Sequence, residues 1–201
     1  MKKMVSWDQA VKFHGHSCFG LAMGYRVAEA ALKELQSDRD VDEEIVAIVE
    51  NDNCSVDAVQ YVTGCTMGKG NLFFHDHGKP VYTFIRRSDN KAVRIVAHGP
   101  DEKRFPELAK LRQKAQSNET TEDDQKRLSE LTADALQQYL DDPLDKVVEI
   151  QRTTREIPEK ARIFNSIICA DCGEKVMEPR ARIKNGQPVC IPCAEEYGSR
   201  V

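Results

Sequence analysis

The stretch Ile45-Val46-Ala47-Ile48-Val49 decides the fold of the larger part of this chain. All five side chains are apolar, so both faces of the segment are hydrophobic, which indicates a strand buried on both sides of a sheet. A charged connector, Ser37 to Glu44, precedes the stretch, and Asp52 to Gly64 after it has the apolar spacing of a helix. We therefore expect a core in which helices pack around this strand.

The segments on either side extend the same pattern. Ser6 and Gln9 have the spacing of a capping box, which predicts a helix from Trp7. The next helix is predicted over Leu21 to Leu35, where apolar residues recur at steps of three and four. Residues 101–141 are highly charged and helical in pattern, with a polar interruption that predicts a helical hairpin.

Further strands are expected after the first one. Three of them, predicted as an antiparallel meander, and one last strand lie at Asn71 to His75, Pro80 to Arg87, Ala92 to His98 and Val147 to Ile150. The predicted fold class is α+β, with helices packed on a mixed, mainly antiparallel sheet. A small C-terminal domain completes it.

That small domain is predicted from four cysteines, Cys169-x-x-Cys172 and Cys190-x-x-Cys193. The spacing lets four thiolates surround one zinc ion. Gly173 follows the first pair, Asn185-Gly186 forms a hairpin turn, and Ala194 to Tyr197 has the pattern of a short helix, which is the order of a treble-clef zinc finger. Two disulfides are the alternative.

Composition limits the classes of function. With 201 residues, we expect two domains, residues 1–157 and a zinc finger at 158–201. The net charge of -4 argues against a nucleic-acid-binding protein, although four basic residues lie in the finger: Lys175, Arg180, Arg182 and Lys184. No apolar run is long enough to span a membrane. No secretory signal precedes Trp7, so we expect a cytoplasmic protein with reduced thiols.

The first domain holds three further cysteines in glycine-flanked segments. In His14-Gly15-His16-Ser17-Cys18-Phe19-Gly20, an extended backbone would point positions 14, 16 and 18 to one side, whereas a helix would align only His14 and Cys18. Two imidazoles and a thiolate are ligands that zinc prefers. Cys18 also lies near a predicted helix start, where free N–H groups favour the thiolate.

The second and third segments follow the buried strand. Cys54 lies near the next predicted helix start, and Asp57 falls on the same helix face. Gly64-Cys65-Thr66-Met67-Gly68-Lys69-Gly70-Asn71 is a glycine-rich loop that departs from the P-loop pattern but could hold a phosphate or carboxylate with Lys69. We expect a shared metal or thiol site from these segments, and a solvated pair at His75 and His77.

Taken in order, the three segments resemble the FmdE family, named for the E subunit of formylmethanofuran dehydrogenase, over roughly residues 10–150. The resemblance implies a homodimer with a cleft lined by His14, His16, Cys18, Cys54, Asp57, Gln60, Cys65 and Lys69. In that cleft Gln60 and Lys69 would bind a cofactor, and the two histidines with Cys18, Cys54 and Cys65 would hold a second metal ion such as zinc. In the methanogen complex the family member accompanies molybdenum- or tungsten-pterin subunits.

Three functions compete on these observations. The first is a metal-binding accessory protein that docks through its zinc finger onto a molybdenum or tungsten enzyme. The second is a stand-alone enzyme acting on a small one-carbon or pterin-linked substrate, with Cys18 and Cys54 as thiolates and Asp57 as general base or ligand. The third is a regulator that binds nucleic acid through the finger.

Overall fold

The computed structural model describes residues 4–100, 102–117 and 119–194. The chain forms two compact units, Met1–Lys160 and Ala161–Val201. This division lies three residues after the expected end of the first domain at residue 157.

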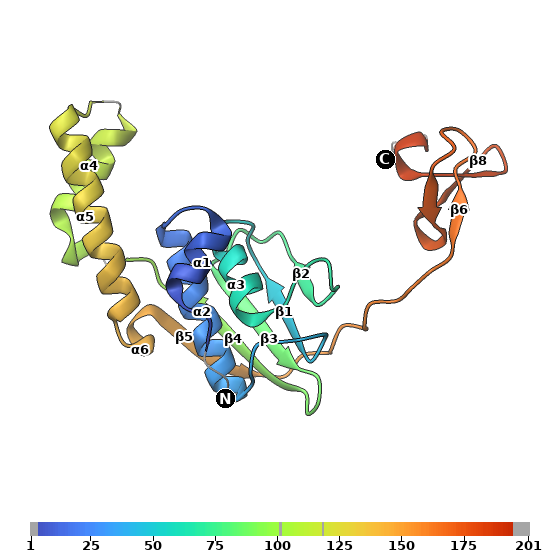
Figure 1. Cartoon of the computed structure of the whole chain (residues 1–201), viewed down its shortest axis with the longest axis horizontal. Coiled ribbons are helices and arrows are strands. Elements are labelled where there is room, and N and C mark those ends of the chain that lie inside the picture. Colours follow the sequence, from blue (N-terminus) through green and yellow to red (C-terminus); the bar gives the residue numbers. More distant parts are fainter. Residues whose placement is uncertain (1–3, 101, 118, 195–201) are drawn as a thin grey trace, which may run out of the picture. The chain divides into compact units, whose positions relative to one another are not determined.

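The larger unit contains a sheet and six helices within the described residues (Figure 1). The helices are α1 (Trp7–His14), α2 (Phe19–Leu35), α3 (Ser55–Thr63), α4 (Pro106–Gln116), α5 (Glu122–Asp141) and α6 (Leu144–Val147), with a 3-10 turn, η1 (Glu102–Arg104). The strands are β1 (Ile45–Val49), β2 (Leu72–Phe74), β3 (Val81–Arg86), β4 (Lys91–Ala97) and β5 (Val148–Thr153). The α+β class is thus confirmed.

The strand order is β2-β1-β3-β4-β5. The β3 and β4 strands pair antiparallel as expected, but the predicted three-strand meander is wrong for β2, which pairs parallel with β1 through Ala47 and Leu72. The chain after β2 therefore crosses the end of β1 before β3 begins. His75 and Lys79 donate backbone N–H groups to the carbonyls of Val49 and Glu50, both at 2.9 Å, so the segment expected to be a tight turn is a crossover.

Both faces of β1 are covered, as its apolar sequence predicts. Ile45, Ala47 and Val49 belong to the main core beneath the helices, whereas Val46 and Ile48 form a smaller cluster on the other face. Ile157 packs against that smaller cluster, and the Arg87 Nη1 donates a hydrogen bond of 2.6 Å to the carbonyl of Pro158. The chain leaving β5 therefore stays attached to the sheet as far as this point.

Two helical predictions hold in detail. Ser6 caps α1 through a capping box with Gln9, and α1 begins at Trp7. The charged segment after β4 forms the hairpin of α4 and α5, in which Thr121 caps α5 and Arg127 pairs with Glu107 at 2.8 Å. No helix in the described residues is long and apolar enough to cross a membrane.

The smaller unit is built from two short hairpins and two 3-10 turns: β6 (Ser166–Ile168), β7 (Lys175–Met177), η2 (Glu178–Arg180), β8 (Arg182–Lys184), β9 (Gln187–Val189) and η3 (Ile191–Cys193). Asn185 and Gly186, with φ of 52° and 76°, make the predicted turn between β8 and β9. The helix expected over Ala194 to Tyr197 extends beyond the described residues. The described part therefore shows the knuckle and hairpin of the predicted finger.

A close approach of two helices positions the rest of the larger unit. A Cβ placed on Gly24 of α2 would lie 2.0 Å from the backbone oxygen of Ser55 at the start of α3. One turn earlier, a Cβ on Gly20 would lie 3.0 Å from the Cβ of Cys54. These two glycines let the starts of α2 and α3 meet, because any larger residue would force the backbones apart.

This approach gives the first prediction. Substitution Gly24→Ala should lower the free energy of unfolding by about 3 kcal/mol, because the added methyl meets backbone rather than a movable side chain. Gly68→Ala is the matched control, since a Cβ there meets nothing within 4 Å, and it should be neutral or stabilise by about 0.5 kcal/mol. Urea unfolding of both variants measures the difference, and equal midpoints would contradict the account.

Candidate metal sites

Four side chains at one end of the larger unit bring metal-ligating atoms together. The donor atoms of His14, His16, Cys18 and Cys54 all lie within 4.8 Å of one another. Two imidazole nitrogens and two thiolate sulfurs form a set that suits tetrahedral zinc. The structure therefore groups four of the five core residues predicted to be metal ligands.

A helix end and a helix start place three of these residues. His14 is the last residue of α1, and Gly15 at φ 97° lets the chain reverse at once. Cys18 is then the N-cap of α2, where its Sγ accepts the Leu21 N–H at 3.4 Å. Neither the extended nor the helical alternative for this segment is right, because the left-handed turn at Gly15 separates two helices.

Cys54 reaches the same place from the turn between β1 and α3. Buried polar groups hold this turn: the Ser55 Oγ lies 3.1 Å from the Asn51 Oδ1 and 2.5 Å from the hydroxyl of Tyr82, while the Asn51 Nδ2 donates to the Lys79 carbonyl at 2.8 Å. Burial raises the pKa of Tyr82, so its hydroxyl keeps the proton it shares with Ser55. This network fixes the backbone that carries Cys54.

Asp57 lies behind one of the ligands. Its Oδ2 is 2.7 Å from the His14 Nδ1, and the His14 Nε2 is 3.9 Å from the Cys18 Sγ. A carboxylate that accepts from one imidazole nitrogen orients the other nitrogen toward a metal and makes it a better donor. The geometry thus gives Asp57, predicted as a general base or ligand, the position of a group that orients His14.

The thiol of Cys54 is harder to ionise than its position near a helix start suggested. Burial, then the hydrogen bond and the charge of the neighbouring Cys18, raise the pKa of Cys54 above its usual value of 9.0. Cys54 itself makes no side-chain cap to α3. Two sulfurs so close together cannot both be negative without a cation, so the pair is suited to a bound metal.

Two residues predicted to line the same cleft lie elsewhere. Cys65 is fully buried, its Sγ contacts the Ile45 carbonyl at 3.5 Å, and burial raises its pKa to about 12. Lys69 pairs with the buried carboxylate of Asp40, which also accepts the Ile45 N–H at 2.8 Å. Both therefore belong to the start of β1, whereas Cys54 follows its end, and their convergence with the Cys/His cluster is corrected.

Gln60 and the two exposed histidines have structural contacts. The Gln60 Oε1 accepts the Met67 N–H at 3.3 Å, so this side chain holds the glycine-rich loop. His77, predicted to be solvated with His75, contacts the buried Glu50 Oε2 through its Nδ1 at 3.0 Å. None of these residues belongs to the four-residue cluster.

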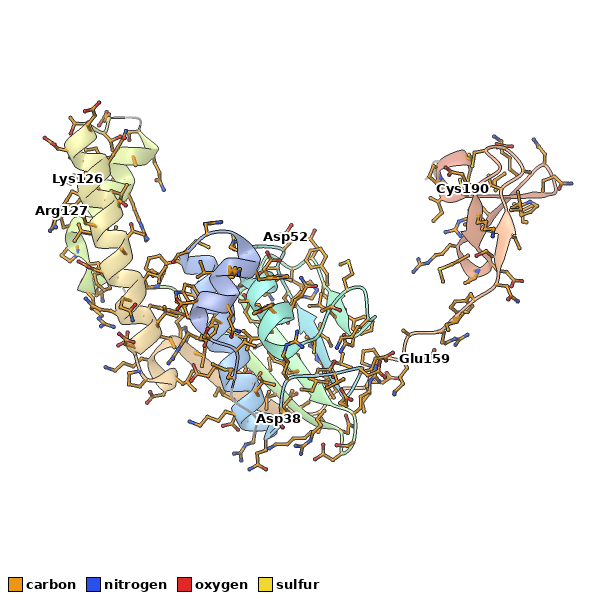
Figure 2. The ribbon with its side chains drawn as sticks, viewed as in Figure 1. Asp38, Asp52, Lys126, Arg127, Glu159 and Cys190 are labelled. Atoms are coloured by element: carbon orange, nitrogen blue, oxygen red, sulfur yellow. The ribbon has the colours of Figure 1, made fainter. Side chains whose placement is uncertain are left out.

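The second cluster is in the smaller unit. The sulfurs of Cys169, Cys172, Cys190 and Cys193 lie within 4.8 Å of one another, and Figure 2 shows Cys190 in this unit. The Cys172 and Cys190 sulfurs are 3.9 Å apart, close to the edge of a zinc–sulfur tetrahedron. Backbone N–H groups lower the pKa of Cys169 to about 6, and hydrogen bonding to the Cys190 sulfur raises the pKa of Cys193 to about 12.

Fold and site together define an α+β protein that has a Cys/His cluster in its main domain and a four-cysteine zinc finger. Residues 13–149 match the family described as FmdE, molybdenum formylmethanofuran dehydrogenase operon, and residues 162–197 match the prokaryotic dksA/traR C4-type zinc finger. The chain belongs to the FmdE family. The resemblance drawn from the three sequence segments is thereby confirmed.

Two relatives place the chain further. A probable S-adenosyl-L-methionine-binding protein of Archaeoglobus fulgidus is 35% identical over 196 residues, which are 94% of this chain and 52% of that protein. The chain thus spans about half the length of this relative. An FmdE-like protein of tungsten formylmethanofuran dehydrogenase type, from Syntrophus aciditrophicus, shares the fold, with a TM-score of 0.61 at 20% identity over 92% of this chain and 88% of that one.

Sequence reasoning missed the residues that support the site. Asn51, Ser55 and Tyr82 become a network only when β3 lies beside β1, which no local pattern announces. Gly20 and Gly24, spaced by four, were a readable signal of a close helix contact. The support of the metal cluster is therefore partly local and partly tertiary.

Metal content tests the two clusters separately. We expect two zinc ions per chain, one for each group of four donors, by elemental mass spectrometry. Cys54→Ser should lose the core zinc and keep that of the finger, and Cys172→Ser should do the reverse and unfold the finger. Cys65→Ala is the control that should keep both ions. A full zinc complement in Cys54→Ser would contradict the core assignment.

Asp57 has its own test. Asp57→Asn should weaken zinc binding at the core by about 10–100-fold, because His14 loses the carboxylate that orients it. Asp52, labelled in Figure 2, is an exposed carboxylate just before α3, and Asp52→Asn serves as the control. Competition with a chromophoric chelator measures both affinities. Equal values would show that Asp57 does not support the metal.

Proposed function

We propose that this FmdE-family chain is a zinc-binding accessory protein of a molybdenum- or tungsten-pterin oxidoreductase of the formylmethanofuran dehydrogenase type. The observation that carries the proposal is the convergence of His14, His16, Cys18 and Cys54, with Asp57 behind His14. The family's description, which names a molybdenum formylmethanofuran dehydrogenase operon, supports the choice of partner. The zinc finger is the docking module in this proposal.

The donor set favours binding over catalysis. Catalytic zinc sites keep three protein ligands and leave one position for water or substrate, whereas four protein ligands close the coordination sphere. The core cluster offers four, so its metal would first of all hold α1, α2 and α3 together. A rigid helical face of this kind suits a subunit that presents a surface to an enzyme.

One observation favours the second candidate, a stand-alone enzyme. His16 is exposed, unlike the partly buried His14, Cys18 and Cys54, so a substrate could replace it at the metal. The substrate in this role is a small one-carbon compound. The Archaeoglobus relative is named for binding S-adenosyl-L-methionine, a methyl donor, and we include that molecule as a candidate ligand.

We further propose that the chain works as a homodimer in the cytoplasm. The many exposed charged side chains of the described residues suit an aqueous compartment, and its thiol-rich clusters need reducing conditions to hold zinc. The twofold is the commonest arrangement of such assemblies. A mass in solution near twice 22.7 kDa would agree with it.

Purification from native cells tests the accessory role. A tagged chain should bring down molybdenum or tungsten, a pterin and formylmethanofuran dehydrogenase activity in fixed proportion. Cys172→Ser should bring down less of all three, because the docking finger is unfolded, while its core zinc remains. An eluate that contains zinc but neither molybdenum nor tungsten would overturn the accessory role.

A separate measurement addresses the enzyme candidate. Titration of the zinc-loaded chain with S-adenosyl-L-methionine should give saturable heat only if the second candidate is right. His16→Ala should then alter the affinity, because it opens the coordination position next to the ligand. Absence of heat in the wild-type chain would exclude this methyl donor.

A further inference from the structure

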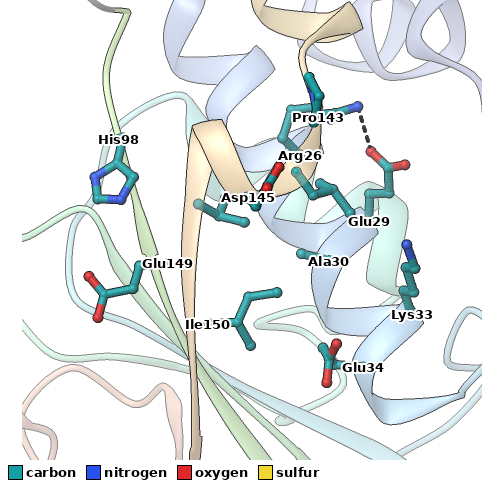
Figure 3. Close-up of a pocket in the computed structure, with 12 residues that line it drawn as sticks. Arg26, Glu29, Ala30, Lys33, Glu34, His98, Pro143, Asp145, Glu149 and Ile150 are labelled. Atoms are coloured by element: carbon teal, nitrogen blue, oxygen red, sulfur yellow. Dashed lines mark ion pairs between the residues drawn. The ribbon is translucent and has the colours of Figure 1, made fainter.

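A groove of about 780 Å³ lies on a part of the larger unit that the metal cluster does not use. Figure 3 shows it between α2, the start of α6 and β5. Cys18 caps the start of α2, whereas the groove begins two turns further along the same helix at Arg26. The volume is within the range of sites that bind ligands, about 300–1,000 Å³.

One wall of the groove is the edge strand of the sheet. In the described residues β5 pairs with β4 alone, so its other edge has no neighbouring strand. Val148 and Ile150 pair across the ladder with the core residues Ala97 and Ile95, and their side chains therefore face α2. An open edge strand beside a helix is the arrangement by which some domains add a peptide as a further strand.

The opposite wall is held in place before any ligand arrives. Arg26 is buried, and its Nη1 donates to the Leu140 carbonyl at 2.9 Å and pairs with Glu29 at 2.9 Å. Arg26 also donates to the Asp142 carbonyl, next to the Pro143 that lines the groove. These contacts tie α2 to the chain that enters α6, so the width of the groove is fixed.

The charges of the groove select the ligand. Glu29 is neutralised by Arg26, which leaves Glu34, Asp145 and Glu149 against Lys33. The floor is apolar and includes Ala30, Leu144 and Ile150. A lysine or arginine side chain can lay its apolar stem on such a floor and place its charge at the carboxylates. The groove is therefore complementary to a basic segment.

We propose that this groove binds an extended basic peptide of another protein, which adds to the free edge of β5 as a sixth strand of the sheet. Backbone hydrogen bonds to β5 supply the affinity. Basic side chains at every second position face α2 and meet Glu34 and Asp145. The site is independent of the metal cluster, and it does not rest on the function proposed above.

Fluorescence anisotropy with a synthetic probe tests the proposal on the full, zinc-loaded chain. The probe is fluorescein-labelled Val-Lys-Val-Lys-Val-Lys, which should bind in a saturable way. The acidic analogue Val-Glu-Val-Glu-Val-Glu should not bind, because the rim repels it. A version with N-methyl groups at alternate residues should also fail, since it cannot donate to a strand edge.

Matched variants locate the site. The double substitution Glu34→Gln/Asp145→Asn should weaken binding about tenfold, because two attractive charges are removed. Asp134→Asn, an exposed carboxylate on α5, should leave binding unchanged. Circular dichroism confirms that the variants keep the fold, and sedimentation shows whether a second copy occupies β5.

Three outcomes would overturn the proposal. Binding by the basic and the N-methylated probe alike would mean that charge alone attracts the peptide. Equal affinity of the double variant and the wild type would place the peptide elsewhere. A dimer that persists at all concentrations and excludes the probe would show that a second copy of this chain covers the edge.

Discussion

The structure depends on the distance at which α2 and α3 pass each other. The absence of side chains at Gly20 and Gly24 lets the first turn of α2 touch the start of α3, and this contact brings Cys18 next to Cys54. Everything around the metal cluster follows from it: α1 can then close over α3 so that His14 reaches Asp57. The catalytic or binding potential of the cluster is thus encoded by two residues that have no chemistry of their own.

Metal has a different part in each unit. The core cluster lies on a scaffold that already buries an extensive set of apolar residues under the helices, so the ion adds to a fold that other forces form. In the described part of the finger, Cys169 and Val189 are the buried apolar residues, too few to fold a module without the ion. Loss of zinc therefore loosens one unit and unfolds the other.

Local patterns predicted much of this structure, and their failures share one cause. The apolar run of β1, the capping box at Ser6 and the four finger cysteines act through neighbours in sequence, and each was found as expected. The parallel partner of β2 and the separation of Cys65 from Cys54 depend instead on which strands meet. Both segments are glycine-flanked and polar, so their residues gave no sign that β1 would hold them at opposite ends.

The raised pKa of Cys54 has a consequence for how the core cluster exchanges its ion. A thiol that holds its proton at neutral pH must release it when zinc arrives, so the metal competes with hydrogen ions for the same sulfur. The apparent affinity then falls about tenfold for each pH unit of acidification per proton released. Occupancy of the cluster would in this way report the acidity of its surroundings, with a mildly acidic compartment emptying a site that a neutral one fills.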